Sequence, residues 1–182
     1  MTARGVWTYA DYAAMPDDGR RYELWDGELS LMPAPGLTHQ GIVRNLLVVL
    51  HQHVIRTGVG VVFPSPVDCI LADTTVLQPD LAFIANDRRA ILTERAIEGP
   101  PTLIVEILSP STRRGDRTVK AAPYARYGVP WYWLVDPGAR TIEALAPRAG
   151  IHEPTGFLQL GEPGALPPLD GLVLDLGQIL GV

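Results

Sequence analysis

The 182-residue chain contains almost no lysine: fourteen of its fifteen basic side chains are arginine, and Lys120 is the exception. Lysine is normally among the commonest residues, so this bias, together with the many Ala, Gly and Pro residues, indicates a high-GC genome. A lone lysine can stand in such a chain by chance. It can also mark a position where a compact ammonium performs a task that the planar guanidinium of arginine cannot perform.

Cysteine and long apolar runs are also scarce, which excludes several classes of protein. Cys69 is the only cysteine, so disulfides within the chain and cysteine-based zinc sites are excluded. Apolar runs such as Leu46–Leu50 are far too short to span a bilayer, and the N-terminus does not have the apolar segment of a secretory signal. We therefore expect a cytoplasmic protein with no membrane partner.

Acidic side chains outnumber basic ones, 20 to 15, giving a net charge of −5 and a pI near 5.3. This balance argues against a protein that binds nucleic acid through net charge alone, although it is compatible with a locally basic cleft. The apolar fraction of 47% excludes an intrinsically disordered chain. The length, without a linker or an internal repeat, predicts a single domain over residues 1–182.

The hydrophobic pattern predicts a mixed α/β (α+β) domain with a central sheet, two main helices and a peripheral hairpin. Asp26-Gly27 between two short apolar segments predicts a hairpin with a type I′ turn. Apolar residues at steps of three and four predict a long helix over 38–56, with Thr38 as its cap. Residues 102–108 are nearly all apolar, as in a central strand buried on both faces. Further strands are expected at 59–63, 67–71, 81–84, 131–135 and 141–145, and further helices at 9–15, 116–127 and within 172–180.

Two carboxylates stand out from this pattern. Glu106 lies within the predicted central strand, where a buried carboxylate must be paired, protonated or metal-bound; a structural salt bridge to an arginine is the alternative. Asp80 follows Pro79 directly before another predicted strand, where an ordinary turn is the simpler interpretation. Together the two could converge on one side of a sheet, and such oxygen ligands suit Mg²⁺ or Mn²⁺.

The segment between the predicted central strand and the next helix is rich in hydroxyl and guanidinium groups. Such a loop can bind phosphate, and a solvated helix entrance is the alternative. Lys120 on the following helix could form a surface ion pair with Asp116, or point toward Glu106 and stabilise charge on a phosphate. The candidate nucleic-acid-binding residues of the loop are Ser109, Ser111, Arg113, Arg114 and Arg117.

Three further features are open to two interpretations. Glu23 in the predicted hairpin is a candidate of lower rank for the site. His39, at the start of the long helix, could contact nucleic acid or lie near the helix cap without a catalytic contact. The aromatic run of residues 131–133 is expected in the core, with an apolar homodimer interface as the alternative.

These residues also lie in motifs of a known family. Residues 105–114 (Val-Glu-Ile-Leu-Ser-Pro-Ser-Thr-Arg-Arg), with Lys120 and residues 132–137 (Tyr-Trp-Leu-Val-Asp-Pro), resemble a bacterial family of restriction-endonuclease-like proteins in the PD-(D/E)xK nuclease superfamily. Residues 22–29 (Tyr-Glu-Leu-Trp-Asp-Gly-Glu-Leu) and 78–80 (Gln-Pro-Asp) are similar to its N-terminal half. The resemblance covers nearly the whole chain.

This resemblance implies a restriction-endonuclease-like core, a mixed central sheet flanked by helices with an N-terminal hairpin, and Mg²⁺-dependent hydrolysis of DNA phosphodiester bonds. Asp80 and Glu106 would bind Mg²⁺ or Mn²⁺, Glu23 would add a carboxylate, and His39 would line the site. The lysine that usually follows the glutamate by two residues is replaced by Leu108. The resemblance assigns the catalytic role of this missing lysine to Lys120.

One departure from the family concerns the helix beside Lys120. Pro123 falls inside this predicted helix, and an internal proline is expected to kink it. An inactive nuclease-like module that binds nucleic acid or a protein partner is therefore the alternative function. A homodimer is expected by analogy with nuclease-like domains that pair to reach both DNA strands.

Overall fold

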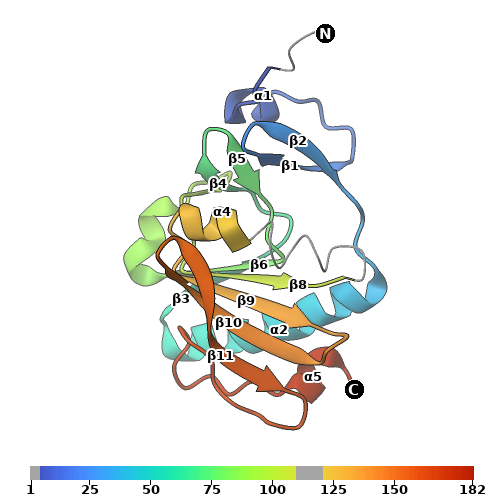
Figure 1. The fold of residues 1–182 in the computed structure, drawn as a ribbon, viewed down its shortest axis with the longest axis vertical. Coiled ribbons are helices and arrows are strands. Elements are labelled where there is room, and N and C mark those ends of the chain that lie inside the picture. The colour runs from blue at the N-terminus through green and yellow to red at the C-terminus, as the bar shows by residue number, and fades with distance from the viewer. Residues whose placement is uncertain (1–4, 110–120) are drawn as a thin grey trace.

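The computed structural model describes residues 5–109 and 121–182, which form two β-sheets with helices packed on them (Figure 1). This arrangement confirms the predicted α+β class. The helices are α1 (Tyr9–Ala13), α2 (Leu37–Thr57), α4 (Ala121–Arg126), α5 (Leu176–Leu180) and the 3₁₀ helix η1 (Asn86–Ile91). The strands are β1 (Arg21–Trp25), β2 (Glu28–Met32), β3 (Gly60–Pro64), β4 (Cys69–Ala72), β5 (Thr75–Leu77), β6 (Leu81–Ala85), β7 (Ile97–Glu98), β8 (Leu103–Ile107), β9 (Trp131–Asp136), β10 (Thr141–Arg148) and β11 (Ile151–Gln159).

Both sheets are mixed. The larger has the strand order β11-β10-β9-β8-β6-β3, in which β8 and β9 are parallel. The smaller has the order β2-β1-β5-β4-β7, in which β4 and β7 are parallel. The N-terminal hairpin is therefore not peripheral to a single sheet, as predicted, but forms one edge of a second sheet. The prediction missed this because β5, which pairs with β1 at Leu24 and Val76, is too short to show a periodicity.

The main core lies between the larger sheet and α2 with α5. On β8, Leu103, Val105 and Ile107 face this core, because alternate side chains of a strand point to the same face. Ile104 and Leu108 belong to a second apolar cluster, with Tyr124 of α4. The predicted central strand is thus confirmed as buried on both faces.

Local signals in the sequence account for several element boundaries. Thr8 caps α1 through a reciprocal capping box with Asp11. Asp26 and Gly27 have φ angles of 46° and 85°, as the predicted type I′ turn requires. The predicted Thr38 cap is wrong: α2 begins at Leu37, and its N-cap is Gly36, which makes no side-chain cap bond.

The strand β11 was not predicted, because Pro154 and Gly156 lie within it. Its position at the edge of the larger sheet explains why a proline is tolerated there. Its partner β10 has a register shift between Ala144 and Leu145, opposite these two residues. The weak pattern in this part of the sequence therefore reflects an irregular edge hairpin.

Tyr132 and Trp133 have no exposed surface, which confirms that these aromatic side chains belong to the core. They are therefore not available for the homodimer interface considered as the alternative.

Pro123 is the third residue of α4, and the helix continues through it to Arg126. Within the described ranges, no helix combines the length and the apolar character needed to cross a membrane.

Candidate active site

Asp80 and Glu106 come from neighbouring strands of the larger sheet. Asp80 directly precedes β6, and Glu106 is the fourth residue of β8. These strands pair antiparallel, with Leu81 opposite Val105. Continuing this register by one residue places Asp80 opposite Glu106, so the two positions singled out in the sequence become neighbours in space.

The Asp80 carboxylate is held by contacts from two different elements. Its Oδ2 accepts a hydrogen bond of 2.8 Å from the backbone N–H of Ile107 on β8. The same oxygen lies 3.1 Å from Nε2 of His39, the third residue of α2. Both side chains are mostly buried, with 13% and 16% of their surface exposed. His39 therefore lies against the candidate site, not merely near the helix cap.

Glu106 points to the face of the sheet that carries α4. It is 3% exposed, and its Oε1 accepts a hydrogen bond of 2.9 Å from the hydroxyl of Tyr124. Burial first, and then the Glu106 and Glu23 carboxylates, raise the pKa of this hydroxyl well above its ordinary value. Tyr124 therefore remains protonated and acts as a hydrogen-bond donor that fixes one oxygen of Glu106.

Glu23 approaches the same region from the smaller sheet. It lies on β1, is 1% exposed, and its Oε1 accepts a hydrogen bond of 2.9 Å from the backbone N–H of Gln78. Its Oε2 accepts a bond of 3.2 Å from Nε1 of Trp25. Both Glu23 and Glu106 contribute to the raised pKa of Tyr124, so both carboxylates lie near that phenol.

The segment from Gln78 to Asp80 joins the two sheets at this point. Its first residue bonds Glu23 on the smaller sheet, and its last bonds β8 of the larger one. The Gln78 side chain is also fixed, since Oε1 accepts a bond of 3.1 Å from Arg21 and Nε2 donates one of 2.9 Å to Asp68. The bond from Tyr124 to Glu106 and the Gln78 bridge were not predicted. The only signal in the sequence for the bond from Tyr124 to Glu106 is that a buried tyrosine hydroxyl needs a hydrogen-bond partner.

The predicted phosphate-binding residues fall at the border of the described structure. Ser109 follows β8, close in sequence to Glu106, and is partly buried. Ser111, Arg113, Arg114, Arg117 and Lys120 lie outside the described residues. The basic loop and the candidate catalytic lysine therefore stay predictions, whereas Asp80, Glu106, Glu23 and His39 have defined surroundings.

The carboxylates of this site can be compared with the ligands that the predicted Mg²⁺ ion requires. Among residues 5–109 and 121–182, no group of three or more histidine, cysteine, aspartate or glutamate side chains is arranged to hold a metal ion. Mg²⁺ does not require one, because it commonly binds one or two carboxylates and completes its shell with water and substrate phosphates. The paired positions of Asp80 and Glu106 fit that mode of binding, with His39 and Tyr124 each fixing one carboxylate oxygen.

Comparison with known proteins assigns the chain to a family. The family described as "Putative restriction endonuclease" (Uma2) matches residues 9–177. No protein of curated function matches the chain. The crystal structure of a protein from Anabaena variabilis, described as "a putative nuclease belonging to DUF820", shares the fold, with a TM-score of 0.75, 21% sequence identity and coverage of 96% of this chain and 97% of that one. The chain therefore belongs to the Uma2 family, whose members are described as "Putative restriction endonuclease".

Proposed function

We propose that this protein is a Mg²⁺-dependent endonuclease that hydrolyses DNA phosphodiester bonds. The observation that carries the proposal is the pairing of Asp80 and Glu106 at adjacent positions of two strands, each with one oxygen fixed by a neighbouring side chain. Membership of a restriction-endonuclease family supports nuclease activity in general. The proposal adds to this general activity that the enzyme uses Mg²⁺ and that its substrate is DNA.

In this mechanism Asp80 and Glu106 would hold the cation. A bound Mg²⁺ supplies Lewis acidity toward a phosphate oxygen and makes water more acidic. Oδ2 of Asp80 is engaged by Ile107 and His39, which fixes the orientation of this carboxylate. The hydrogen bond from Tyr124 fixes the rotamer of Glu106, so both ligands are oriented before substrate arrives.

The remaining residues act on the phosphate. Lys120 stabilises the negative charge that develops on the phosphorus oxygens. Arg113, Arg114 and Arg117 bind flanking phosphates through their planar forks, with Ser109 and Ser111 as hydroxyl donors. Glu23 is a further buried carboxylate near Tyr124 and would keep the local field negative, which favours binding of a cation.

The test compares cleavage of plasmid DNA with Mg²⁺ or Mn²⁺ by the wild type, Asp80→Asn and Glu106→Gln. Each substitution removes one ligand charge with little change in shape, and we expect a loss on the order of 100-fold or more in rate. Glu98→Gln, an exposed carboxylate on β7, is the matched control. Calorimetric titration with Mn²⁺ separates metal binding from catalysis, and unchanged cleavage in both site variants would contradict the assignment.

Lys120→Arg tests the lysine separately. The substitution keeps the charge, but the bulkier planar guanidinium cannot replace a compact ammonium beside a metal site. We expect cleavage to be lost while Mn²⁺ binding is retained. Full activity in this variant would show that Lys120 provides only charge.

A further inference from the structure

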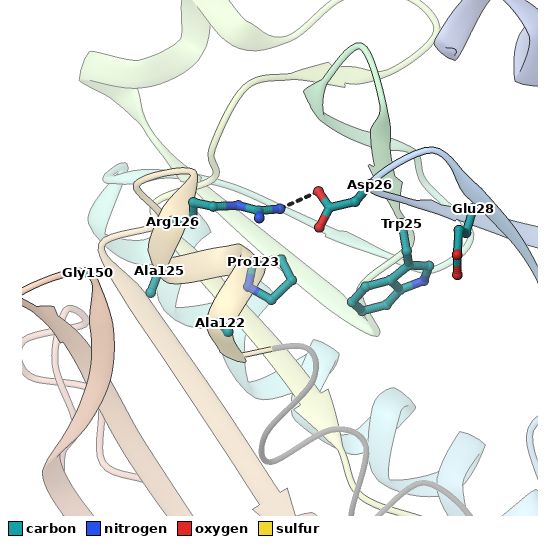
Figure 2. Close-up of a pocket in the computed structure, with 8 residues that line it drawn as sticks. All are labelled: Trp25, Asp26, Glu28, Ala122, Pro123, Ala125, Arg126 and Gly150. Atoms are coloured by element: carbon teal, nitrogen blue, oxygen red, sulfur yellow. Dashed lines mark hydrogen bonds and ion pairs between the residues drawn. The ribbon is translucent and has the colours of Figure 1, made fainter. Parts of the chain in front are cut away.

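A pocket opens beside the candidate active site, between the N-terminal hairpin and α4. It has a volume of about 830 Å³ and is lined by Trp25, Asp26, Glu28, Ala122, Pro123, Ala125, Arg126 and Gly150. This volume lies within the range of small-molecule sites. Figure 2 shows Trp25 on the hairpin and Pro123 on α4 pointing toward one another from opposite walls. We call it the hairpin pocket.

The Trp25 ring is held in place by the active site itself. Its Nε1–H donates to Oε2 of Glu23 at 3.2 Å, so one edge of the indole is directed toward the carboxylates. The rest of the ring is partly buried and packs against the apolar cluster that includes Tyr124. An aromatic ring that lines a pocket and is anchored in this way offers a preorganised stacking surface.

Among the described residues, the charges that line the pocket disfavour phosphate. Arg126 is bound to Asp26 in an ion pair and lies over the ring of Tyr127 at 4.7 Å. Glu28, opposite Trp25 across the hairpin, is exposed and forms no hydrogen bond or ion pair with any residue of the described ranges. A carboxylate at this position repels phosphate but accepts hydrogen bonds from amino groups.

We propose that the hairpin pocket binds an unstacked nucleobase with an exocyclic amino group, preferring cytosine to thymine. The base would stack on Trp25, with Pro123 on its other side, and donate from its amino group to Glu28. Cytosine carries an amino donor at the position where thymine carries a carbonyl acceptor, so Glu28 distinguishes two bases of nearly equal size. This inference rests on the proposed function, because it makes the pocket the base-binding part of a nucleic-acid site.

Binding to single-stranded DNA without metal tests the pocket separately from catalysis. Fluorescence anisotropy in EDTA compares oligo-dC with oligo-dT of equal length at one fixed, low salt concentration. We expect the wild type to bind oligo-dC several-fold more tightly. Trp25→Leu should weaken binding of both strands on the order of tenfold, whereas Trp25→Phe, which retains an aromatic face, should keep most of the affinity.

The preference itself is tested at Glu28. Glu28→Gln should abolish the preference for oligo-dC, because an amide offers both a donor and an acceptor. Phe157→Leu and Glu98→Gln, an exposed aromatic on β11 and an exposed carboxylate on β7, are the matched controls and should bind as the wild type does. Circular dichroism confirms that each variant is folded.

The outcomes separate this inference from the nuclease proposal. Equal affinity of the wild type for the two strands, or unchanged binding by Trp25→Leu, would overturn the pocket assignment even if plasmid DNA is cleaved. A cytosine preference that depends on Trp25 and Glu28, without cleavage in Mg²⁺ or Mn²⁺, would support the pocket and contradict the nuclease activity.

Discussion

The hydroxyl of Tyr124 donates a 2.9 Å hydrogen bond to Oε1 of Glu106, and both side chains are buried between the larger sheet and α4. This bond ties the helix to the central strand at the candidate metal ligand. It also explains how Glu106 is accommodated between Ile104 and Leu108, which face the same apolar cluster. The position of α4 and the orientation of the carboxylate are therefore coupled.

Tyr124→Phe removes this bond and keeps the ring, which packs on Tyr132 with a centroid separation of 5.3 Å. We expect a loss of about 1–3 kcal/mol in the free energy of unfolding, because a buried carboxylate loses a donor. Urea denaturation measures this loss. If Glu106 is a metal ligand, Mn²⁺ affinity should fall as well.

Tyr9→Phe is the control for this substitution. Tyr9 stacks on Tyr12, and its hydroxyl forms no hydrogen bond with the described part of the chain. Its stability should remain within about 0.5 kcal/mol of the wild type, as for most surface changes. Equal stability of the two variants would mean that the bond from Tyr124 to Glu106 contributes nothing measurable.

A second prediction concerns the attachment of α4 to β11. The ring nitrogens of His152 lie 3.0 Å and 3.1 Å from the carbonyl oxygens of Ala121 and Val129, one at the start of α4 and one just after its end. His152→Leu removes both contacts from a buried position. We expect a loss of about 1–3 kcal/mol in stability and faster hydrogen exchange in α4.

The exposed His51 on α2 provides a matched control, since His51→Leu changes the same residue type without removing a buried contact. Mass-spectrometric hydrogen exchange on both variants measures the protection of α4 directly. Protection of α4 that does not change in His152→Leu would show that the helix is held by its apolar contacts alone.

The extent to which the sequence predicts this structure depends on how local each signal is. The Asp26-Gly27 turn and the long helix α2 follow from spacings of a few residues, and the structure contains them. The buried strand with Glu106 follows from composition. The join between the sheets through Gln78 does not, because its partners Glu23 and Asp68 lie 55 and 10 residues away and no periodicity reports such contacts. The same holds for the hairpin pocket, whose walls come from segments about a hundred residues apart in the sequence.

The third prediction is a pH dependence of stability that arises at His53. This histidine on α2 is 4% exposed, and burial, followed by the nearby charge of Arg56, lowers the pKa of its ring below the ordinary value. The unfolded chain therefore binds the proton more tightly than the folded one. Stability is complete above the ordinary histidine pKa of about 6.5 and falls as the pH drops through that value.

His53→Gln should weaken this acid sensitivity. The measurement is the difference in Tm between about pH 7.5 and about pH 5.5, on either side of the ordinary pKa of histidine. The difference should be smaller in His53→Gln than in the wild type, and His51→Gln should leave it unchanged. An identical difference in all three proteins would assign the acid sensitivity to other groups.

The fourth prediction concerns two glycines whose surroundings differ. A methyl group added at Gly41, within α2, meets no atom within 4 Å, and Ala is the better helix former. Gly41→Ala should therefore stabilise the protein by about 0.5–1 kcal/mol. At Gly60 on β3 the same methyl group would collide with the carbonyl oxygen of Ile84 on the paired strand β6.

Gly60→Ala should consequently destabilise the protein, because neither backbone can move without breaking the ladder between β3 and β6. Urea denaturation of the two variants measures both effects, and the sign of the change is the decisive result. Since β6 begins directly after Asp80, a displaced ladder should also lower Mn²⁺ affinity in Gly60→Ala and not in Gly41→Ala. Stabilisation by both substitutions would mean that β3 and β6 are less closely paired in solution than this geometry requires.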